Sequence, residues 1–420
     1  MKLSCRFPGV CLLLAFGSLN VYGAEQIRIE IREPAGISRS NCPVHGVLQL
    51  PRAVPFTTHF RLSHAGKPVL AQFRPKVSVT GEVPPGAKKR TTSQWWLDFS
   101  TPLAPHETRE YVVQYGADIP AGPERMRGHK LTERGNDYVI SNAPHLQWII
   151  PRDLNGFIKS LDFPPAEHLR PDSKGLMIRD QQGTVHPLGG EGTISHVVRE
   201  GTMAIVLRFQ KTETHPALRG IRWTADLIFP SPVSWVEFQL RVNDPGNRAE
   251  AVGMQLHLNL DSPSSGIPTL VDLGASRTVY TSLSVNHSVE LRAQIPATEK
   301  DGEQTPPWTV LRGSTGELKP FVLAPNASSH AEGWAHVMDR KRCLAIAFDS
   351  FAQQGEERIK VQGSGTLSAW KRFSSRRSQK RYENQKQWRS WLHFVHFPPQ
   401  ASARADPQQM QSPIVLRQKN

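Results

Sequence analysis

The feature that most constrains this sequence is a strict alternation of apolar and polar side chains over residues 235–243. Val236, Phe238, Leu240 and Val242 fall on one side of an extended chain, because successive side chains of a strand point to opposite faces. Only a half-buried strand needs this pattern. The same period recurs over 203–209, 221–229 and 254–260, with turn residues between the segments. Residues 201–261 therefore predict four successive antiparallel strands in one sheet.

The polar side of the last two of these strands carries amides, an imidazole, a guanidinium and an indole, where a solvated face favours Thr, Lys and Glu. An ordinary solvent-facing sheet is one interpretation, since any alternating strand has a polar row. The other is a concave sheet that lines a sugar-binding groove, with the indole as a platform and Arg241 as a clamp for a carboxylate. His257 would donate a hydrogen bond or, in an enzyme, accept a proton. The predicted substrate-binding residues are Trp235, Gln239, Arg241, Asn243, Gln255, His257 and Asn259.

Composition and punctuation predict an all-β protein. The chain has 34 Pro and 31 Gly, and short alternating runs recur between turn signals, whereas long helical periodicities are missing. At 420 residues the chain is too long for one small core. The predicted units are a signal peptide (1–24), a first β domain (25–116), a linker (117–128), a large antiparallel β-sandwich (129–399) and a tail (400–420). One short helix near 375–387 is the only one expected.

The first residues have the composition of a secretory signal: Lys2 and Arg6, an apolar run over 10–16, and small residues up to Ala24. The mature protein is therefore expected to be exported to a periplasmic or extracellular location. No later apolar run approaches the ~18 residues of a membrane span. The remaining Cys42 and Cys343 either form one disulfide or stay free, and they cannot make a metal site by themselves. No metal site and no particular cofactor is indicated.

Residues 371–389 hold much of the excess positive charge of a chain with formal net charge +14. Eight Lys or Arg and a single acid, Glu383, lie between Trp370 and Trp391. The segment is either a solvated charged loop or an anion-binding edge with aromatic side chains interleaved as stacking surfaces. Its predicted anion-binding residues are Arg376, Arg377, Lys380 and Arg381. An exported chain without a recognised nucleic-acid module is not expected to bind nucleic acid.

Three stretches carry a resemblance to a known family: residues 33–39 (EPAGISR), 43–51 (PVHGVLQLP) and 94–99 (QWWLDF). In order and content they resemble the N-terminal RIFT-barrel domain of exo-rhamnogalacturonan lyase-like (YetA-like) proteins. Residues 138–399 are similar to the central β-sandwich of that family. The resemblance implies a RIFT-barrel-like domain followed by a supersandwich-like domain, in a carbohydrate context. Lyases of that family continue into a C-terminal α/α toroid that these residues do not show, and no catalytic residue is transferred.

Two functions follow as hypotheses. The first is an exported carbohydrate-binding or scaffold protein for acidic polysaccharide, with a partner chain as an option. The alternative is a polysaccharide lyase, in which His257, Arg241 and Tyr382 would supply base, carboxylate neutralisation and acid. His393 and His396 are further candidates, but an interval of three places them on opposite faces of a strand. Motifs of serine hydrolases, metalloproteases and phosphate-binding loops are not found.

Overall fold

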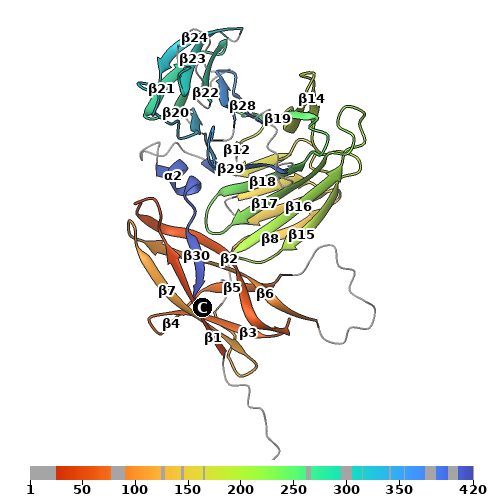
Figure 1. Ribbon diagram of the computed structural model, residues 1–420, viewed down its shortest axis with the longest axis vertical. Helices are drawn as coiled ribbons and strands as arrows, with labels where there is room; N and C mark the ends of the chain where they lie inside the picture. The colour runs from red at the N-terminus through yellow and green to blue at the C-terminus, as the bar shows by residue number, and fades with distance from the viewer. Residues whose placement is uncertain are drawn as a thin grey trace, which may run out of the picture.

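The computed structural model describes residues 25–76, 90–123, 128–142, 146–163, 166–261, 266–294, 305–314, 316–339, 342–353, 355–373, 385–395 and 405–419. The predicted signal peptide and the four predicted anion-binding residues lie outside these ranges. Across the described residues the protein is almost entirely antiparallel β-sheet, which confirms the predicted all-β class. Figure 1 shows a smaller N-terminal unit below a larger sandwich.

The N-terminal unit consists of a five-stranded sheet, β30-β1-β7-β3-β4, and a three-stranded sheet, β2-β6-β5. Alternating Ile27, Ile29 and Ile31 point into a core that both sheets share. The strands are β1 (Glu25–Arg32), β2 (Arg39–Pro55), β3 (His59–His64), β4 (Lys67–Val69), β5 (Ala71–Pro75), β6 (Thr91–Leu103), β7 (Thr108–Gly116) and β30 (Val415–Lys419).

The end of the chain is part of this unit, so its prediction as a tail is wrong. Strand β30 pairs antiparallel with β1, and Ile414 and Leu416 pack in the N-terminal core. The Gln418 side chain accepts a hydrogen bond from Gln49 N–H at 3.0 Å and donates one to Gln49 O at 2.8 Å, which connects β30 to β2 across the gap between the sheets. The last strand therefore completes the five-stranded sheet of the N-terminal unit, and Figure 1 shows it as a blue strand among red ones.

A short helix, α2 (Ala405–Gln411), leads into β30 and lies against the sandwich. Arg39 fixes this passage between the two units: its guanidinium donates to Gln409 O at 3.1 Å and to Ser412 O. Arg39 is itself held by Glu33, at 2.8 Å, with both side chains fully buried. Although burial opposes its ionisation, hydrogen bonds from Arg39 and from backbone N–H groups hold the pKa of Glu33 at about 2.

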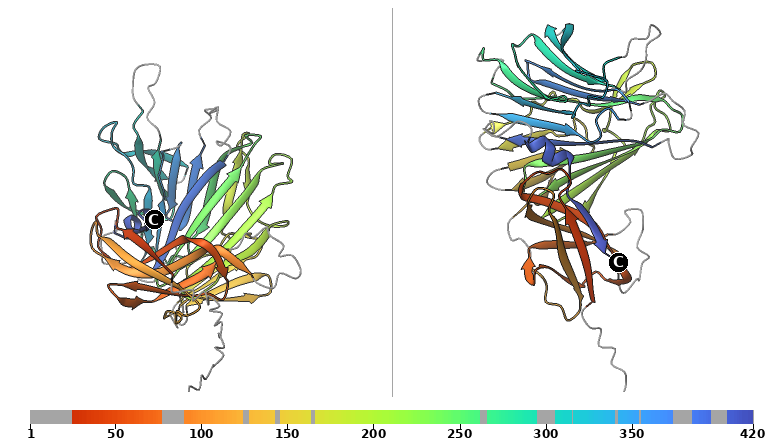
Figure 2. Two further views of the ribbon diagram at one scale, coloured as in Figure 1. Left: turned by 60° about the horizontal axis from the view of Figure 1, so that its bottom comes forward. Right: turned by 60° about the vertical axis from the view of Figure 1, so that its left-hand side comes forward.

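The sandwich consists of a nine-stranded sheet, β15-β16-β17-β18-β29-β26-β25-β20-β21, packed on an eight-stranded sheet, β14-β13-β19-β28-β27-β22-β23-β24. A five-stranded sheet, β12-β11-β10-β9-β8, adds its inner side chains to the same core. Figure 2 shows the two large sheets stacked in layers above the N-terminal unit.

The strands of the nine-stranded sheet are β15 (Ile194–Arg199), β16 (Ala204–Thr212), β17 (Arg222–Pro230), β18 (Trp235–Asn243), β20 (Thr269–Gly274), β21 (Thr278–Leu283), β25 (Trp334–Met338), β26 (Cys343–Phe348) and β29 (Gln385–Val395). Those of the eight-stranded sheet are β13 (Gly175–Asp180), β14 (Val185–Pro187), β19 (Ala249–His257), β22 (His287–Ala293), β23 (Trp308–Ser314), β24 (Glu317–Leu323), β27 (Glu357–Gln362) and β28 (Thr366–Arg372). The five-stranded sheet has β8 (Lys130–Arg134), β9 (Asp137–Asn142), β10 (Leu146–Pro151), β11 (Ser160–Phe163) and β12 (Ala166–Glu167).

The predicted four-stranded sheet over 201–261 holds for three strands and is wrong for the fourth. Strands β16, β17 and β18 are neighbours, but β18 takes β29 as its other partner, and β19 crosses to the opposite sheet between β13 and β28. The alternation alone cannot show whether β19 pairs with β18 or lies in the facing sheet. In both arrangements its apolar side chains enter the same core. Of the predicted helix near 375–387, only the end is described, and there it forms the start of β29.

The N-terminal unit docks on β15 and the residues after it through a buried ion pair. Arg199 Nη1 lies 2.8 Å from Asp98 Oδ1 of β6, and its guanidinium stacks over the Trp96 ring at 4.6 Å. Gln72 Oε1 accepts from Met203 N–H at 3.0 Å. A Cβ on Gly201 would lie 1.9 Å from Gln72 Oε1, so any other residue at this position would displace the Gln72 side chain. Burial raises the pKa of Asp98 to about 6.

The two cysteines that the structure describes are both buried, Cys42 in the N-terminal core and Cys343 on β26, and they form no disulfide with each other, which resolves the alternative left open by their spacing. Where the chain is described, none of its helices is long and apolar enough to cross a membrane. Residues 117–123 of the predicted linker run along the N-terminal unit, where Gly122 N–H donates to Phe60 O at 2.9 Å.

Candidate functional site

A polar pocket of about 320 Å³ opens where β26 stops pairing with β29. The last residue pair of these strands is Phe348 with Ser390, and Asp349 N–H then donates to Arg389 O at 3.1 Å as the chain turns away from the sheet. This leaves an opening between the two large sheets. The pocket is lined by Gln239, Leu240, Arg241, Asp349, Ser350, Lys371, Gln387, Trp388 and Arg389. We call it the inter-sheet pocket.

Lys371 forms the inner wall of the inter-sheet pocket. It follows Leu367 and Ala369 on the core-facing side of β28, and its side chain is only 5% exposed. Its one ion-pair partner among the described residues is Glu357, with Nζ 3.5 Å from Oε1. An ammonium group has three N–H donors, so this buried cation keeps donor capacity toward the pocket. A buried ammonium group whose N–H donors have no acceptor costs free energy. The position of Lys371 therefore suits an oxygen-rich or anionic ligand.

Two guanidinium groups, those of Arg241 and Arg389, lie at the outer side of the pocket. Arg241 pairs with Asp226, which also receives a bidentate pair from Arg208 at 2.6 and 2.9 Å. One carboxylate thus serves two arginines, and Arg241 remains 41% exposed. The N–H groups of Arg241 that Asp226 does not accept favour a negatively charged or strongly polar ligand.

Arg389 is fixed by a buried carboxylate, Glu237, through Nε at 2.7 Å. Glu237 also accepts from Gln239 Nε2 at 2.6 Å and from Trp391 Nε1 at 3.2 Å, and the Arg389 guanidinium lies 4.7 Å from the Trp391 ring centre. Burial opposes its ionisation, but Arg389 and the other donors lower the pKa of Glu237 below its ordinary value. Glu237 therefore orients two pocket residues, Gln239 and Arg389, through its hydrogen bonds to both.

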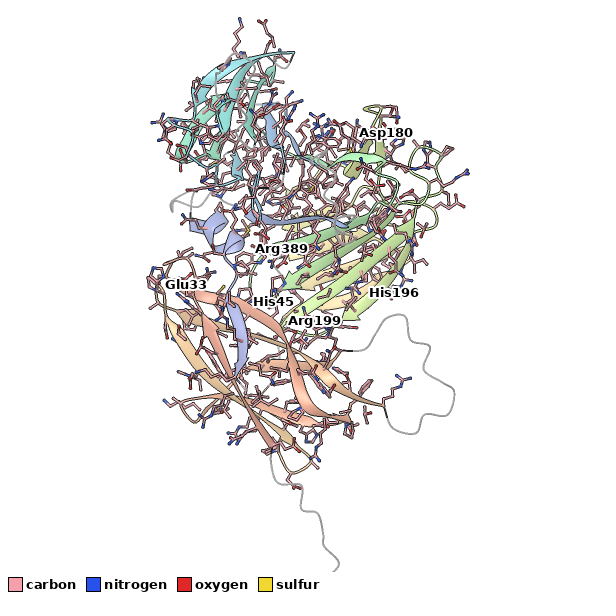
Figure 3. The ribbon with its side chains drawn as sticks, in the orientation of Figure 1. Glu33, His45, Asp180, His196, Arg199 and Arg389 are labelled. Atoms are coloured by element: carbon pink, nitrogen blue, oxygen red, sulfur yellow. The ribbon has the colours of Figure 1, made fainter. Side chains whose placement is uncertain are left out.

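His45 of the N-terminal unit reaches the same carboxylate, with Nε2 3.7 Å from Glu237 Oε2. Figure 3 shows His45 at the upper edge of the N-terminal unit, below Arg389, with Arg199 to its side. Burial lowers the pKa of His45 to about 4, against the attraction of Glu237, so the imidazole is neutral near pH 7. Glu237 contacts both His45 of the N-terminal unit and the pocket residues Gln239 and Arg389, and so connects this unit to the pocket.

The structure brings together only some of the predicted substrate-binding residues. Gln239 and Arg241 line the inter-sheet pocket, and Asn243 is half-buried at the end of the same strand. Trp235 is buried in a cluster with Trp391 and Met410 of α2, so it offers no open platform.

The other three predicted residues lie on a different surface. Strand β19 belongs to the eight-stranded sheet, so Gln255, His257 and Asn259 do not share a face with β18, and the prediction of one common groove is wrong. His257 Nδ1 lies 2.8 Å from Asp172 Oδ2, and Gln255 Nε2 lies 2.7 Å from His257 Nε2. Asn259 donates to Glu167 O at 3.1 Å.

The predicted basic segment contributes to the site through its two ends. Lys371 and Arg389 both line the inter-sheet pocket, whereas Arg376, Arg377, Lys380 and Arg381, like Tyr382 and His396, lie outside the described residues. His393 Nε2 is within 2.9 Å of Ser234 Oγ. Lys371 itself was not predicted as a site residue, although a lysine at an apolar position of an alternating strand is a sequence signal for it. Asp349 and Gln387 give no such signal.

Among the described residues, no group of three or more His, Cys, Asp or Glu is arranged to hold a metal ion. The inter-sheet pocket instead combines cationic donors, amides, a hydroxyl and one carboxylate, Asp349. Such a set binds hydroxyl and carboxylate oxygens through hydrogen bonds.

No protein-family model and no curated protein matches this sequence. Among solved structures, an α-mannosidase from Enterococcus faecalis V583 is similar over 94% of this chain and 46% of its own, with 10% identity and a TM-score of 0.53. A glycosyl hydrolase family 38 protein from Enterococcus faecalis is similar over 94% of this chain and 47% of its own, with 11% identity and a TM-score of 0.50. A GalM/aldose epimerase homologue from C. elegans covers 64% of this chain, with 10% identity and a TM-score of 0.35.

The chain is similar in fold to carbohydrate-active enzymes. It spans about half the length of the two Enterococcus proteins. At 10% and 11% identity the likeness concerns the fold alone. Because it covers 94% of the chain, it includes both the N-terminal unit and the sandwich.

Proposed function

We propose that this protein is an exported carbohydrate-binding protein that holds an acidic sugar in the inter-sheet pocket. The observation that carries the proposal is the buried ammonium of Lys371 in one cavity with the guanidinium groups of Arg241 and Arg389. The lining holds three cations and one carboxylate, Asp349, and the N–H groups that the cations do not use in their pairs with Asp226, Glu237 and Glu357 suit the carboxylate of a uronate, while Gln239 and Gln387 suit its hydroxyl groups. The fold likeness supports a carbohydrate ligand in general. The family resemblance to exo-rhamnogalacturonan lyase-like proteins and the signal-like first residues support the acidic sugar and the export.

A polysaccharide lyase is the second candidate, because the same cations would neutralise a uronate carboxylate and thereby acidify the C–H bond next to it. Asp349 lines the same pocket and is the carboxylate available there as a base. In β-elimination the base takes the C5 proton, a C4–C5 double bond forms, and the C4–O bond breaks with protonation of the leaving oxygen.

The experiment is a calorimetric titration with methyl galacturonate, with methyl galactoside as the uncharged control. The proposal expects binding of the acid, weakened by salt, and a loss of affinity of at least about tenfold for the uncharged sugar, since a charge-assisted hydrogen bond contributes about 1.5–3 kcal/mol. Equal affinity for the two sugars would contradict an acidic-sugar site. Incubation with oligogalacturonate separates the two candidates: ultraviolet absorbance of an unsaturated uronate that disappears in Asp349→Asn would identify a lyase.

A further inference from the structure

A second pocket, of about 570 Å³, lies on the other side of the loop that follows β26. Ser350 lines both this cavity and the inter-sheet pocket, so the loop over 349–353 is the wall between them. The second pocket is bounded by ends of strands from both large sheets, at Ala293 of the eight-stranded sheet and Phe348 of the nine-stranded sheet.

The dividing loop is held in an unusual backbone conformation. Ser350 and Ala352 have φ of 52° and 58°, in the left-handed region that side chains other than glycine rarely adopt. The buried Glu357 accepts a hydrogen bond from Ala352 N–H, and Gln353 N–H donates to Ser350 O at 3.2 Å. Left-handed residues persist where the surrounding structure fixes them, and they gather at ligand sites. Both pockets therefore have a preformed common wall.

The lining of the second pocket differs from that of the first in charge. Phe351, Pro307 and Ala331 give it an apolar surface, and none of the described residues that line it is Lys or Arg. Its polar groups are the amides of Gln294, Gln353 and Gln411, the Ser350 hydroxyl, the His330 imidazole and the Glu332 carboxylate. A carboxylate ligand would meet no cation here and would approach Glu332. An uncharged ring with one apolar face and several hydroxyl groups matches this lining.

The C-terminal segment supplies one side of this pocket. Gln411, the last residue of α2, donates from Nε2 to Phe348 O at 2.8 Å and to Glu332 O at 2.6 Å. These bonds connect two loops that line the cavity. The pocket is therefore complete only when α2 is docked, the same position that allows β30 to pair with β1 in the N-terminal unit.

From this lining we infer that the second pocket is a binding site for an uncharged pyranose, separate from the acidic-sugar site across the loop. The apolar part of the lining, at Ala331 and Pro307, contacts the C–H face of the sugar, and the amides at the rim pair with its hydroxyl groups. The inference shares the carbohydrate class with the proposed function but does not depend on the first pocket.

The test is saturation-transfer NMR on the full chain with the methyl pyranosides of glucose, galactose and mannose as probes. We expect transfer from at least one of them. The double substitution His330→Ala/Gln353→Ala changes two exposed rim residues, so the fold should persist, as thermal unfolding will check. Loss of two hydrogen bonds of about 1 kcal/mol each should raise the Kd by about tenfold or more. Arg241→Ala, at the first pocket, should leave that Kd unchanged.

Absence of transfer from all three pyranosides, or a Kd that the double substitution leaves unaltered, would overturn the inference. A Kd that rises with Arg241→Ala instead would assign the uncharged sugar to the first pocket and overturn it as well. Methyl galacturonate in the same samples reports on the proposed function independently: its binding should depend on Arg241 and be indifferent to His330 and Gln353.

Discussion

Lys371 and Glu357 face each other on neighbouring strands of the eight-stranded sheet, with 3.5 Å between Nζ and Oε1, and their side chains are 5% and 1% exposed. Glu357 also holds the loop between the two pockets through Ala352 N–H. Burial raises the pKa of Glu357, so this carboxylate is easily neutralised if its partner is lost. One ion pair thus positions both a cation in the inter-sheet pocket and the wall of that pocket.

Lys371→Met should abolish binding of methyl galacturonate and also destabilise the fold. Removing one partner of a buried ion pair typically costs about 3–5 kcal/mol, because the other charge stays buried without compensation. Lys371→Met/Glu357→Gln should recover most of that stability, since the amide still accepts from Ala352 N–H, yet should not recover binding. Urea unfolding and calorimetry measure the two effects. Recovery of binding in the double variant would show that Lys371 acts only on the fold.

Arg241→Ala should weaken binding of an acidic sugar by about 10- to 100-fold, the range expected for one lost charge-assisted hydrogen bond. The melting temperature should change little, because Arg241 is 41% exposed and Asp226 keeps its bidentate pair with Arg208. Arg222→Ala is the matched control: it is an exposed arginine on the adjacent strand β17, outside the pocket lining. Equal losses of affinity in the two variants would indicate general charge attraction and no specific site.

The polar row of β18 could be predicted from the sequence because alternation sets which side chains face away from a core. The strands that pair with β18 could not be predicted in this way. The partner of β18 is β29, and the registered pair Gln239 with Arg389 joins residues far apart in the chain. The local turn after Asn243 suggested a hairpin, but the Asp244 carboxylate instead accepts from Lys386 at 2.8 Å and from Arg248 and Ala249 N–H, which fixes a crossing between sheets. The direction of a side chain follows from the local sequence. The sheet that a strand joins depends instead on which strands, distant in the sequence, pair with its edges.

Asp98 should make the protein relatively more stable in mild acid. Burial raises its pKa from 3.8 to about 6, so the folded protein binds this proton more tightly than the unfolded chain does. The resulting stabilisation is fully present below about pH 4 and is lost as pH rises through about 6, with a total of about 3 kcal/mol. In Asp98→Asn that contribution disappears. The difference in free energy of unfolding between wild type and variant should therefore shift in favour of the wild type as pH falls from 6 to 4.

His45 should have the opposite effect in nearly the same range. Burial lowers its pKa from 6.5 to about 4, so the unfolded chain binds this proton more tightly. Stability from the neutral imidazole is fully present above about pH 6.5 and is lost as pH falls through about 4, again by about 3 kcal/mol. His45→Gln should therefore gain on the wild type as the medium becomes acidic. Slopes of the same sign for His45→Gln and Asp98→Asn, measured by urea unfolding, would contradict the described junction between the units.

The sequence gives no clear sign that β30 joins the N-terminal unit, because three of its five residues carry charged or amide side chains. Its two apolar anchors, Ile414 and Leu416, show their role only against a core made by the beginning of the chain. A strand that supplies few apolar residues is stable through its partner, which here is β1. The alternation of residues within this short segment therefore could not predict its pairing with β1.

Ile414→Ala should therefore destabilise the N-terminal unit, although the substitution lies near the opposite end of the chain. Ile414 is 7% exposed, and truncation of a buried isoleucine typically costs about 2–5 kcal/mol. Val415→Ala is the matched control, because Val415 is 41% exposed and a surface change stays within about 0.5 kcal/mol. Hydrogen exchange should show loss of protection in β1 for Ile414→Ala and none for Val415→Ala. If both variants keep the protection of β1, the last strand does not stabilise the N-terminal unit. If Ile414→Ala instead loosens β26 first, the segment acts through α2 and its contact with the sandwich.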